Sequence, residues 1–188
     1  MGVLETIKNR RSIRDFKDED IPAEAVDSLI EALRWAPSAG NLQSRKFYFV
    51  FNDGIKIKLA GAAGNPGPVA RIKKIVKNAL TINFISRAPL VVVACLDRRI
   101  KEKYGDRGIE LYAIQDVAAS VMNMMLAAHE LGLGSVWVGA FDENEVALVM
   151  SLPDNLRPVA LIPLGYPAVI PRPTARMSRD KAVVIINE

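Results

Sequence analysis

Residues 109–141 read IELYAIQDVAASVMNMMLAAHELGLGSVWVGAF, and this stretch decides the fold of the chain. Positions 109–131 are mostly apolar on every side of a helix, and such a helix must be wrapped by protein or by lipid. At 1.5 Å per residue the helix spans roughly 35 Å, the width of a small domain. Polar residues such as Asp116 and Glu130 interrupt the run of about 18 apolar residues that a membrane span requires. We therefore expect a long central helix buried in protein, and no membrane contact.

The same stretch continues from this helix into a strand. Gly132 and Gly134 end the helix, and residues 135–141 form a short apolar run of the kind that predicts a buried strand. Gly139 interrupts that run near its end. We expect the strand to stop there, with exposed backbone beside a pocket.

The composition indicates one domain over residues 1–188. Half of the residues are hydrophobic and the mean hydropathy is +0.14, which is apolar for a chain that covers its own surface and favours an extensive subunit interface. Cys95 is the only cysteine and lies in an apolar run, so we expect it in the core of a cytoplasmic protein without an intrachain disulfide. The net charge of +4 favours anionic ligands.

Helical and strand patterns are mixed along the chain rather than strictly alternating, which predicts an α+β fold. Helices are expected at residues 3–9, 20–36, 53–63, 72–80 and 142–150, strands at 47–51, 89–96, 158–165 and 182–186, and polar or charged loops at 37–43 and 97–108. After Pro167 the chain is an arm without hydrophobic periodicity until its last apolar strand. A partner subunit's sheet edge would give this arm a surface to pack on.

Two common site patterns fail in this sequence. Gly132 and Gly134 leave a helix instead of opening one, and Trp137 stands where a dinucleotide fingerprint needs its third glycine. His129 is the only histidine and has no paired ligand, so we expect a hydrogen-bonded core histidine and no metal site. The basic residues of 72–80 are better explained as a solvated helix face than as a nucleic-acid site.

The segment around Arg10, Arg11, Ser12 and Arg14 is the strongest candidate for ligand binding. Three guanidinium groups and a hydroxyl within five residues suit the geometry of a phosphate or of a planar anionic edge. A solvated basic turn is the equally weighted alternative. The loop 37–43 supplies short polar groups that suit the edge of a heterocycle, or it is only a helix stop.

Together these motifs resemble the FMN-dependent nitroreductase family. The resemblance runs from about residue 4 to residue 186. It is carried by an ordered set of motifs, which are Arg10-Arg11-Ser12-Ile13-Arg14-Asp15-Phe16, Ala36-Pro37-Ser38-Ala39-Gly40-Asn41-Leu42-Gln43, Gln115-Asp116, Gly132-Leu133-Gly134-Ser135-Val136-Trp137-Val138-Gly139-Ala140-Phe141, and Gly165-Tyr166-Pro167 followed by Arg176.

The resemblance implies an α+β homodimer with a central mixed or antiparallel sheet, a C-terminal arm exchanged between subunits, and FMN bound at the interface. One chain would hold the cofactor's phosphate, ribityl chain and pyrimidine edge, and the partner's loop would close the site. The implied set is Arg10, Arg11, Ser12, Arg14 and the phosphate-binding Arg176, with Trp137, Val138, Gly139 and Ala140 on the flavin N5 side, and Pro37, Ser38, Ala39 and Asn41 from the partner.

The sequence departs from the family pattern at three places. Ser44-Arg45 follows the loop where the family often has Pro-Trp, Thr174 stands where a lysine often precedes the late arginine, and Asn83 is an imperfect counterpart of a family asparagine.

The implied activity is NAD(P)H-dependent reduction of FMN, followed by reduction of a nitroaromatic, a quinone or a similar small acceptor. A flavin carries out the hydride chemistry itself, which agrees with the lack of an acid–base pair or a nucleophile in the motifs. A flavin-fragmenting enzyme, a reductive dehalogenase and a flavin-binding sensor without turnover remain alternatives.

Overall fold

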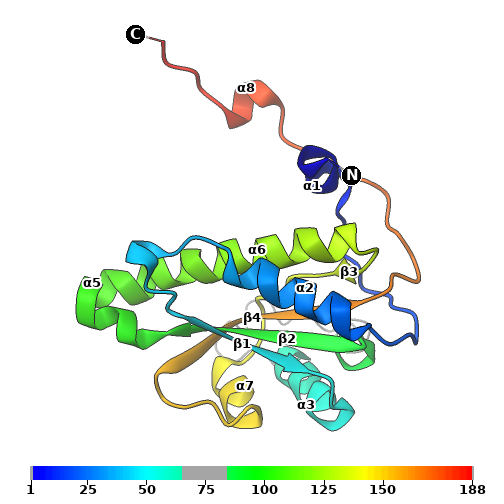
Figure 1. The fold of residues 1–188 in the computed structure, drawn as a ribbon, viewed down its shortest axis with the longest axis horizontal. Helices are drawn as coiled ribbons and strands as arrows, with labels where there is room; N and C mark the ends of the chain where they lie inside the picture. The colour runs from blue at the N-terminus through cyan, green and yellow to red at the C-terminus, as the bar shows by residue number, and fades with distance from the viewer. Residues whose placement is uncertain (1, 65–83, 188) are drawn as a thin grey trace.

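The structure is a computed structural model that describes residues 2–64 and 84–187. Its centre is a four-stranded antiparallel sheet in the order β1-β2-β4-β3 (Figure 1). The strands are β1 (Arg45–Val50), β2 (Leu90–Asp97), β3 (Gly134–Ser135) and β4 (Leu156–Gly165). The sheet and the helices around it confirm the α+β prediction.

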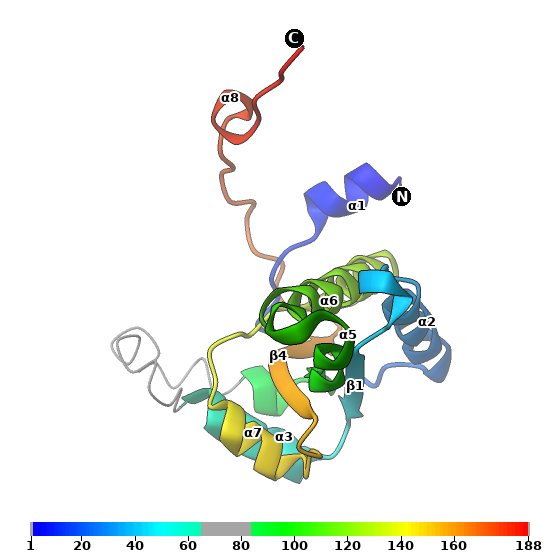
Figure 2. The ribbon, with the colours of Figure 1, turned by 90° about the vertical axis from the view of Figure 1, so that its left-hand side faces the viewer.

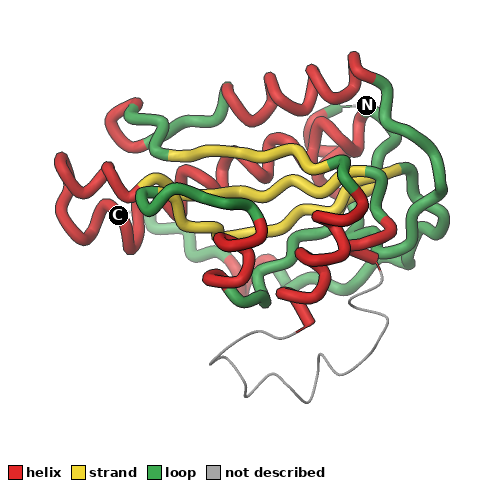
Figure 3. Tube along the Cα trace, turned by 90° about the horizontal axis from the view of Figure 1, so that it is seen from below, coloured by secondary structure: helices red, strands yellow, loops and turns green. Residues whose placement is uncertain are grey.

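Helices cover both faces of this sheet (Figures 1 and 2). One face carries α2 (Ala23–Arg34) and α6 (Ala113–Glu130), and the other carries α3 (Asp53–Gly64) and α7 (Glu143–Val149). Seen from below, helices lie in front of and behind the strands (Figure 3). The predicted helix 72–80 and Asn83 lie outside the described residues.

Strand β2 shows why the two layers form. All of its residues are buried, and alternate side chains enter the cores on opposite faces of the sheet. Val91, Val93 and Cys95 join the core beneath α3 and α7, whereas Val92 and Leu96 join the core beneath α2 and α6. Cys95 is therefore a core residue as predicted, and burial raises the pKa of its thiol to about 12.

The long central helix is present, but one chain does not wrap it all round. Val117, Val121 and Met124 are fully buried against the sheet, while Ile114 and Met122 are 38% and 42% exposed. The helical run over residues 98–130 is long and apolar enough to pass a length-and-composition test for a membrane span. Its buried face packs on α2 and on the sheet, as that of a core helix does.

The prediction of a loop at residues 97–108 is wrong, because the segment is helical. It forms η3 (Arg98–Ile100), α5 (Lys101–Arg107) and the π-helical turn η4 (Gly108–Tyr112), which leads directly into α6. The Asp97 carboxylate accepts a hydrogen bond from the Arg99 N–H at 3.0 Å and so begins the helical run. Gly105, with φ of 59°, kinks the segment and accounts for its loop-like sequence.

Two predicted strands are also different in the structure. The run 135–141 contributes only Ser135 of β3, which also bridges Ser12, and one bridge between Val138 and Leu161, because the chain leaves the sheet after Val138. The predicted strand 182–186 is absent from the described chain. Ala182 is the last residue of α8 (Arg179–Ala182), and residues 183–187 are exposed without secondary structure. The arm runs away from the sheet (Figure 1), where no strand lies beside it to pair with.

Candidate functional site

The arginine-rich segment lies along the β3 end of the sheet, next to the strand that precedes Gly139. Ser12 forms a parallel bridge with Ser135, and the Ile13 N–H donates to the Ser135 carbonyl at 3.0 Å. Further on, Phe16 bridges Pro167. Gly134 is required at this crossing, because a Cβ there would lie 2.5 Å from the Ile13 side chain. Residues 12 and 13 are therefore held beside Ser135, at the start of the run that leads to residues 137–140 in the same chain.

A cavity of about 260 Å³ lies between this segment and the C-terminal end of α6. It is lined by Asn9, Arg10, Arg11, Ile13, His129, Gly132, Leu133, Gly134, Ser135, Pro167 and Ile170. The Nη1 atom of Arg10 is buried and has no hydrogen-bond partner among the described residues. A polar ligand that entered the cavity would satisfy this atom.

The electrostatics of the cavity favour an anion. The pKa of Arg10 is lowered, first by burial and then by the positive charges of Arg11 and Arg176. The charges of Arg11 and Arg176 are thus near enough to repel the Arg10 guanidinium, although Arg176 comes from the opposite end of the chain. A bound phosphate would turn this repulsion into charge-assisted hydrogen bonding. The residues present fit a cofactor that carries a phosphate.

The other arginines and Ser12 differ in how firmly they are held. The Arg11 Nη1 donates to the carbonyls of Lys8 and Arg10 at 2.6 and 2.8 Å, which fixes the turn. Ser12 is half-buried and Arg14 is exposed. The Arg176 Nη1 donates to the Thr174 hydroxyl at 2.7 Å, so the residue that departs from the family pattern holds this arginine.

The Gly139 segment offers a free backbone donor. Val138 is anchored by two backbone hydrogen bonds of 2.9 Å with Leu161, and the chain then leaves the sheet. Gly139 itself is exposed, and no described residue accepts a hydrogen bond from its N–H. Trp137 is 37% exposed beside it, and Ala140 is half-buried. The exposed backbone at this strand end agrees with the prediction, whereas the pocket expected beside it remains a prediction.

The loop 37–43 is rigidly held at the other end of α6. The Arg45 guanidinium donates to the carbonyls of Ala36 at 2.6 Å and Pro37 at 2.9 Å, and the Ala39 N–H donates to the Asp116 carboxylate at 3.0 Å. The pKa of Asp116 is nevertheless raised, because burial outweighs the Ala39 hydrogen bond and the Arg45 charge.

The backbone of this loop is strained. Gly40, Asn41 and Gln43 have φ values of 54°, 55° and 53°, in the left-handed region that only glycine adopts readily. Pro37 and Asn41 are exposed, whereas Ser38 and Ala39 are half-buried. Strain of this kind is stored at sites that hold a ligand, provided that the surroundings fix the backbone, as Arg45 and Asp116 do here.

The predicted site residues are divided into two groups within one chain. The arginine cavity is lined by His129, whereas the loop is bonded to Asp116, and these two positions on α6 are roughly 20 Å apart at 1.5 Å per residue. The two groups lie at opposite ends of α6 (Figure 1). The structure brings residues 10–14 and Arg176 toward one end and leaves Pro37, Ser38, Ala39 and Asn41 at the other, while Val138 lies farther along the sheet, opposite Leu161.

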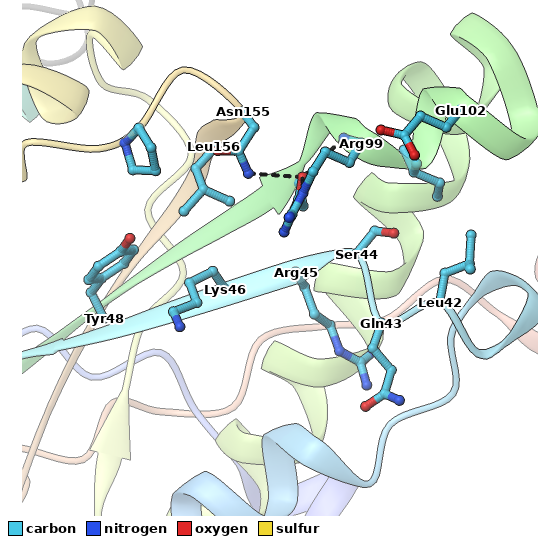
Figure 4. Close-up of a pocket in the computed structure, with 13 residues that line it drawn as sticks. Leu42, Gln43, Ser44, Arg45, Lys46, Tyr48, Arg99, Glu102, Asn155 and Leu156 are labelled. Carbon is cyan, nitrogen blue, oxygen red and sulfur yellow. Dashed lines mark hydrogen bonds and ion pairs between the residues drawn. The ribbon is translucent and has the colours of Figure 1, made fainter.

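A second cavity, of about 610 Å³, lies at the β1 edge of the sheet and was not predicted from the sequence (Figure 4). It is lined by Leu42, Gln43, Ser44, Arg45, Lys46, Tyr48, Asp97, Arg99, Ile100, Glu102, Pro153, Asn155 and Leu156. Its buried carboxylate is already paired: the Asn155 amide and the Arg99 Nε donate to Asp97 at 3.1 and 2.9 Å. Burial alone would raise the pKa of Asp97, but these hydrogen bonds lower it to about 2.

His129 differs from its prediction. It is only half-buried, and its Nε2 is buried without a hydrogen-bond partner among the described residues. The sequence gives no sign of this, because the environment of His129 depends on segments far away in the chain. In the part of the chain that the structure describes, no three His, Cys, Asp or Glu side chains gather as they would around a metal ion.

Comparison with known proteins identifies the family. A model of the nitroreductase family matches residues 7–166. The chain is 30% identical over 179 residues to a protein of Methanothermobacter thermautotrophicus that bears the name NADH dehydrogenase/NAD(P)H nitroreductase, and the match covers 91% of this chain and 80% of that protein.

Two solved structures share the fold. A nitroreductase family protein from Clostridium novyi NT superimposes with a TM-score of 0.76 at 31% identity, covering 89% of this chain and 86% of that one. The NADPH:FMN oxidoreductase of Vibrio harveyi, solved with NAD+, superimposes with a TM-score of 0.81 at 26% identity. The match covers 99% of this chain and 77% of that one. The chain belongs to the nitroreductase family.

Proposed function

We propose that this protein is an oxidoreductase that uses NAD(P)H to reduce bound FMN and then passes the electrons to a nitroaromatic, a quinone or a similar small acceptor. The observation that carries the proposal is the orphaned Nη1 of Arg10, buried in a cavity among like charges on the same sheet edge as the free N–H of Gly139. One feature fits a phosphate and the other fits a hydrogen-bond acceptor on a ring.

The residues of the chain bind and orient the cofactor. Arg10, with Arg11 and Arg176, holds the phosphate by charge-assisted hydrogen bonds. Ser12 and Arg14 would hold the ribityl chain and the pyrimidine edge, where a guanidinium would favour the anionic reduced form. The Gly139 N–H would be a donor to flavin N5, with Trp137, Val138 and Ala140 lining that side. When bound, FMN supplies the hydride chemistry, so no protein nucleophile or acid–base pair is needed.

The division of the site between the two ends of α6 supports a homodimer. A second copy would bring its own loop, with Pro37, Ser38, Ala39 and Asn41, to the arginine cavity of the first. Apolar residues available for such an interface stay exposed on α1 (Val3–Asn9), on α6 and beside it: Val3, Leu4, Ile7, Ile114, Met122 and Leu131. Unpartnered apolar surface of this kind marks an interaction site.

The C-terminal arm gives a second reason to propose a dimer. Val184 and Ile186 are 84% and 82% exposed, although their pattern is that of a buried strand. Strand β1 is an edge of the sheet and has unpaired backbone groups along it. We propose that the arm of each subunit adds to the sheet of its partner, which would form the strand that one chain alone does not have.

The test is the absorption spectrum and turnover of the purified protein. We expect a yellow protein that releases FMN and not FAD on denaturation, and that oxidises NAD(P)H in the presence of a quinone. FMN bound without any NAD(P)H oxidation above that of free FMN would indicate a flavin-binding sensor instead. A colourless protein that refuses added FMN would overturn the proposal.

A further inference from the structure

His129 is placed unlike an ordinary core histidine. It lies in the last turn of α6 and lines the same cavity as Arg10 and Arg11. Its Nε2 is buried and forms no hydrogen bond with any described residue. A buried polar atom without a partner is unfavourable and rare, so it requires an explanation such as a bound ligand.

The described residues contain only two buried side-chain nitrogen or oxygen atoms without a partner, and they are the Nη1 of Arg10 and the Nε2 of His129. Both side chains line this one cavity. Buried polar groups elsewhere in the described chain are paired, including those of Lys56 and Asp97. The coincidence of both exceptions at one place points to a single polar ligand that contacts both side chains.

The protein groups around His129 do not supply the missing partner. Glu130, the next residue, accepts a hydrogen bond from the Thr6 hydroxyl. Arg10 and Arg11 are donors only and cannot accept a hydrogen bond from an imidazole N–H. The carbonyl end of α6 carries partial negative charge, which disfavours an anion unless side-chain donors offset it. His129 and the two arginines are the side chains able to do so.

The size of the cavity limits what enters it. Pockets that enclose drug-sized ligands measure about 300–1,000 Å³, and this cavity of about 260 Å³ is smaller. It therefore accepts one end of a larger molecule. The positive charges of Arg10, Arg11 and Arg176 favour an anionic group at that end of the ligand.

We infer that His129 binds the phosphate end of the flavin cofactor together with Arg10, by donating the Nε2–H to a phosphate oxygen. This inference rests on the proposed function and adds a phosphate-binding residue to the site. Because the cavity is too small for a whole flavin, the isoalloxazine ring would lie outside it, and the contribution of His129 should depend on the phosphate and not on the flavin ring.

The test compares FMN with riboflavin, which has the same ring and no phosphate. Flavin fluorescence quenching gives both dissociation constants for the wild type, for His129→Leu and for His129→Gln. We expect His129→Leu to weaken FMN binding at least tenfold, equal to about 1.4 kcal/mol, and to change riboflavin binding less than twofold. Glutamine keeps an N–H donor, so His129→Gln should stay within about threefold of the wild type for FMN.

A matched control is Lys58→Leu, which removes an exposed charge from α3 on the opposite face of the sheet. It should leave both dissociation constants unchanged. If His129→Leu weakens FMN and riboflavin equally, or weakens neither, the inference is wrong while the proposed function stands. A glutamine variant as weak as the leucine variant would reject the role as a donor. A wild type that binds neither flavin would reject the proposed function itself.

A second measurement needs no substitution. The sequence contains a single histidine, so the imidazole ¹⁵N signals of labelled protein belong to His129 without further assignment. We expect added FMN to shift the Nε2 signal and riboflavin to leave it in place, with inorganic phosphate giving a smaller shift than FMN. An Nε2 signal that moves equally with FMN and riboflavin would overturn the inference.

Discussion

The two ends of α6 treat their polar groups in opposite ways. At the Asp116 end, the loop 37–43 is strained but its polar groups are paired through Arg45 and Asp116. At the His129 end, two buried nitrogens have no partner among the described residues, and Arg10 is repelled by two other arginines. The polar groups at the Asp116 end hold the loop in place, whereas those at the His129 end are available to a ligand. Substitutions at the first should reduce stability, whereas those at the second should reduce binding.

The largest effect is expected from Arg45→Met. The Arg45 guanidinium donates to four carbonyls around the end of α2 and the loop, those of Arg34, Ala36, Pro37 and Asp116. Loss of these bonds should lower the free energy of unfolding by about 2–4 kcal/mol. Chemical denaturation measures this. Lys46→Met, the exposed neighbour on β1, is the control and should change stability by less than about 0.5 kcal/mol. Equal losses in the two variants would contradict the role of Arg45.

Arg10→Ala tests the other end of the helix. FMN binding should weaken by roughly ten- to a hundredfold, since a charge-assisted hydrogen bond is worth about 1.5–3 kcal/mol, and riboflavin binding should stay nearly constant. The FMN-free protein should lose no stability, because the substitution removes a buried unpaired atom and a like-charge repulsion. Fluorescence titration measures the flavin affinities, and thermal unfolding measures the stability of the FMN-free protein. A strongly destabilised FMN-free variant would mean that Arg10 is structural.

Asp97 adds an acid-dependent contribution at the β1 edge. Its pKa is lowered to about 2 in the folded protein, against about 3.9 for an unperturbed aspartate. The ionised form therefore stabilises the fold above about pH 4, and up to about 2 kcal/mol is lost as the pH falls from 4 toward 2. Unfolding measured across this range should show the loss in the wild type. The loss should be absent in Asp97→Asn and retained in the exposed-site control Asp20→Asn.

Gly40→Ala gives the smallest effect and probes the strain of the loop. Gly40 has a φ of 54°, and a Cβ there would lie 2.4 Å from the Tyr104 hydroxyl. The substitution should cost about 1–2 kcal/mol. Gly61→Ala is the matched control, because Gly61 is helical with open space around it and should gain about 0.5–1 kcal/mol. A neutral Gly40→Ala would show that the left-handed backbone is not required.

The sequence predicts well the elements whose signals are local. The long helix α6, the strand β2 and the helix expected at 142–150 are all found, and Asp142 accepts hydrogen bonds from the N–H groups of Asn144 and Glu145 at the start of α7. The segment after Arg10 pairs with Ser135, which leads to Gly139, whereas their roles in one site remain a prediction.

The missed features depend on residues far apart in the chain. The Asp97 carboxylate that begins the helical run is held by Arg99 and by the distant Asn155. The hydrophobic pattern of residues 97–108 does not reveal these hydrogen bonds. The predicted strand 47–51 does not include Arg45, and the role of this residue follows only from the carbonyls at the end of α2 that its guanidinium contacts in the fold. The strand 182–186 does not form within the described chain, and its proposed pairing with a partner's sheet edge is not encoded in the local sequence. The proposed role of His129 in ligand binding follows only from the cavity that it lines together with Arg10.

The most direct test of the shared site is a mixed dimer. Arg10→Ala and Asn41→Trp subunits are co-expressed with different tags, and the heterodimer is purified and assayed at an FMN concentration too low to load either homodimer. If each flavin uses Arg10 of one chain and the loop of the other, two-fold symmetry leaves one intact site and one site with both lesions. We expect about half of the wild-type activity and about one FMN per heterodimer. Activity near zero in verified heterodimers would contradict the account, because it would place both groups at a site formed within one chain.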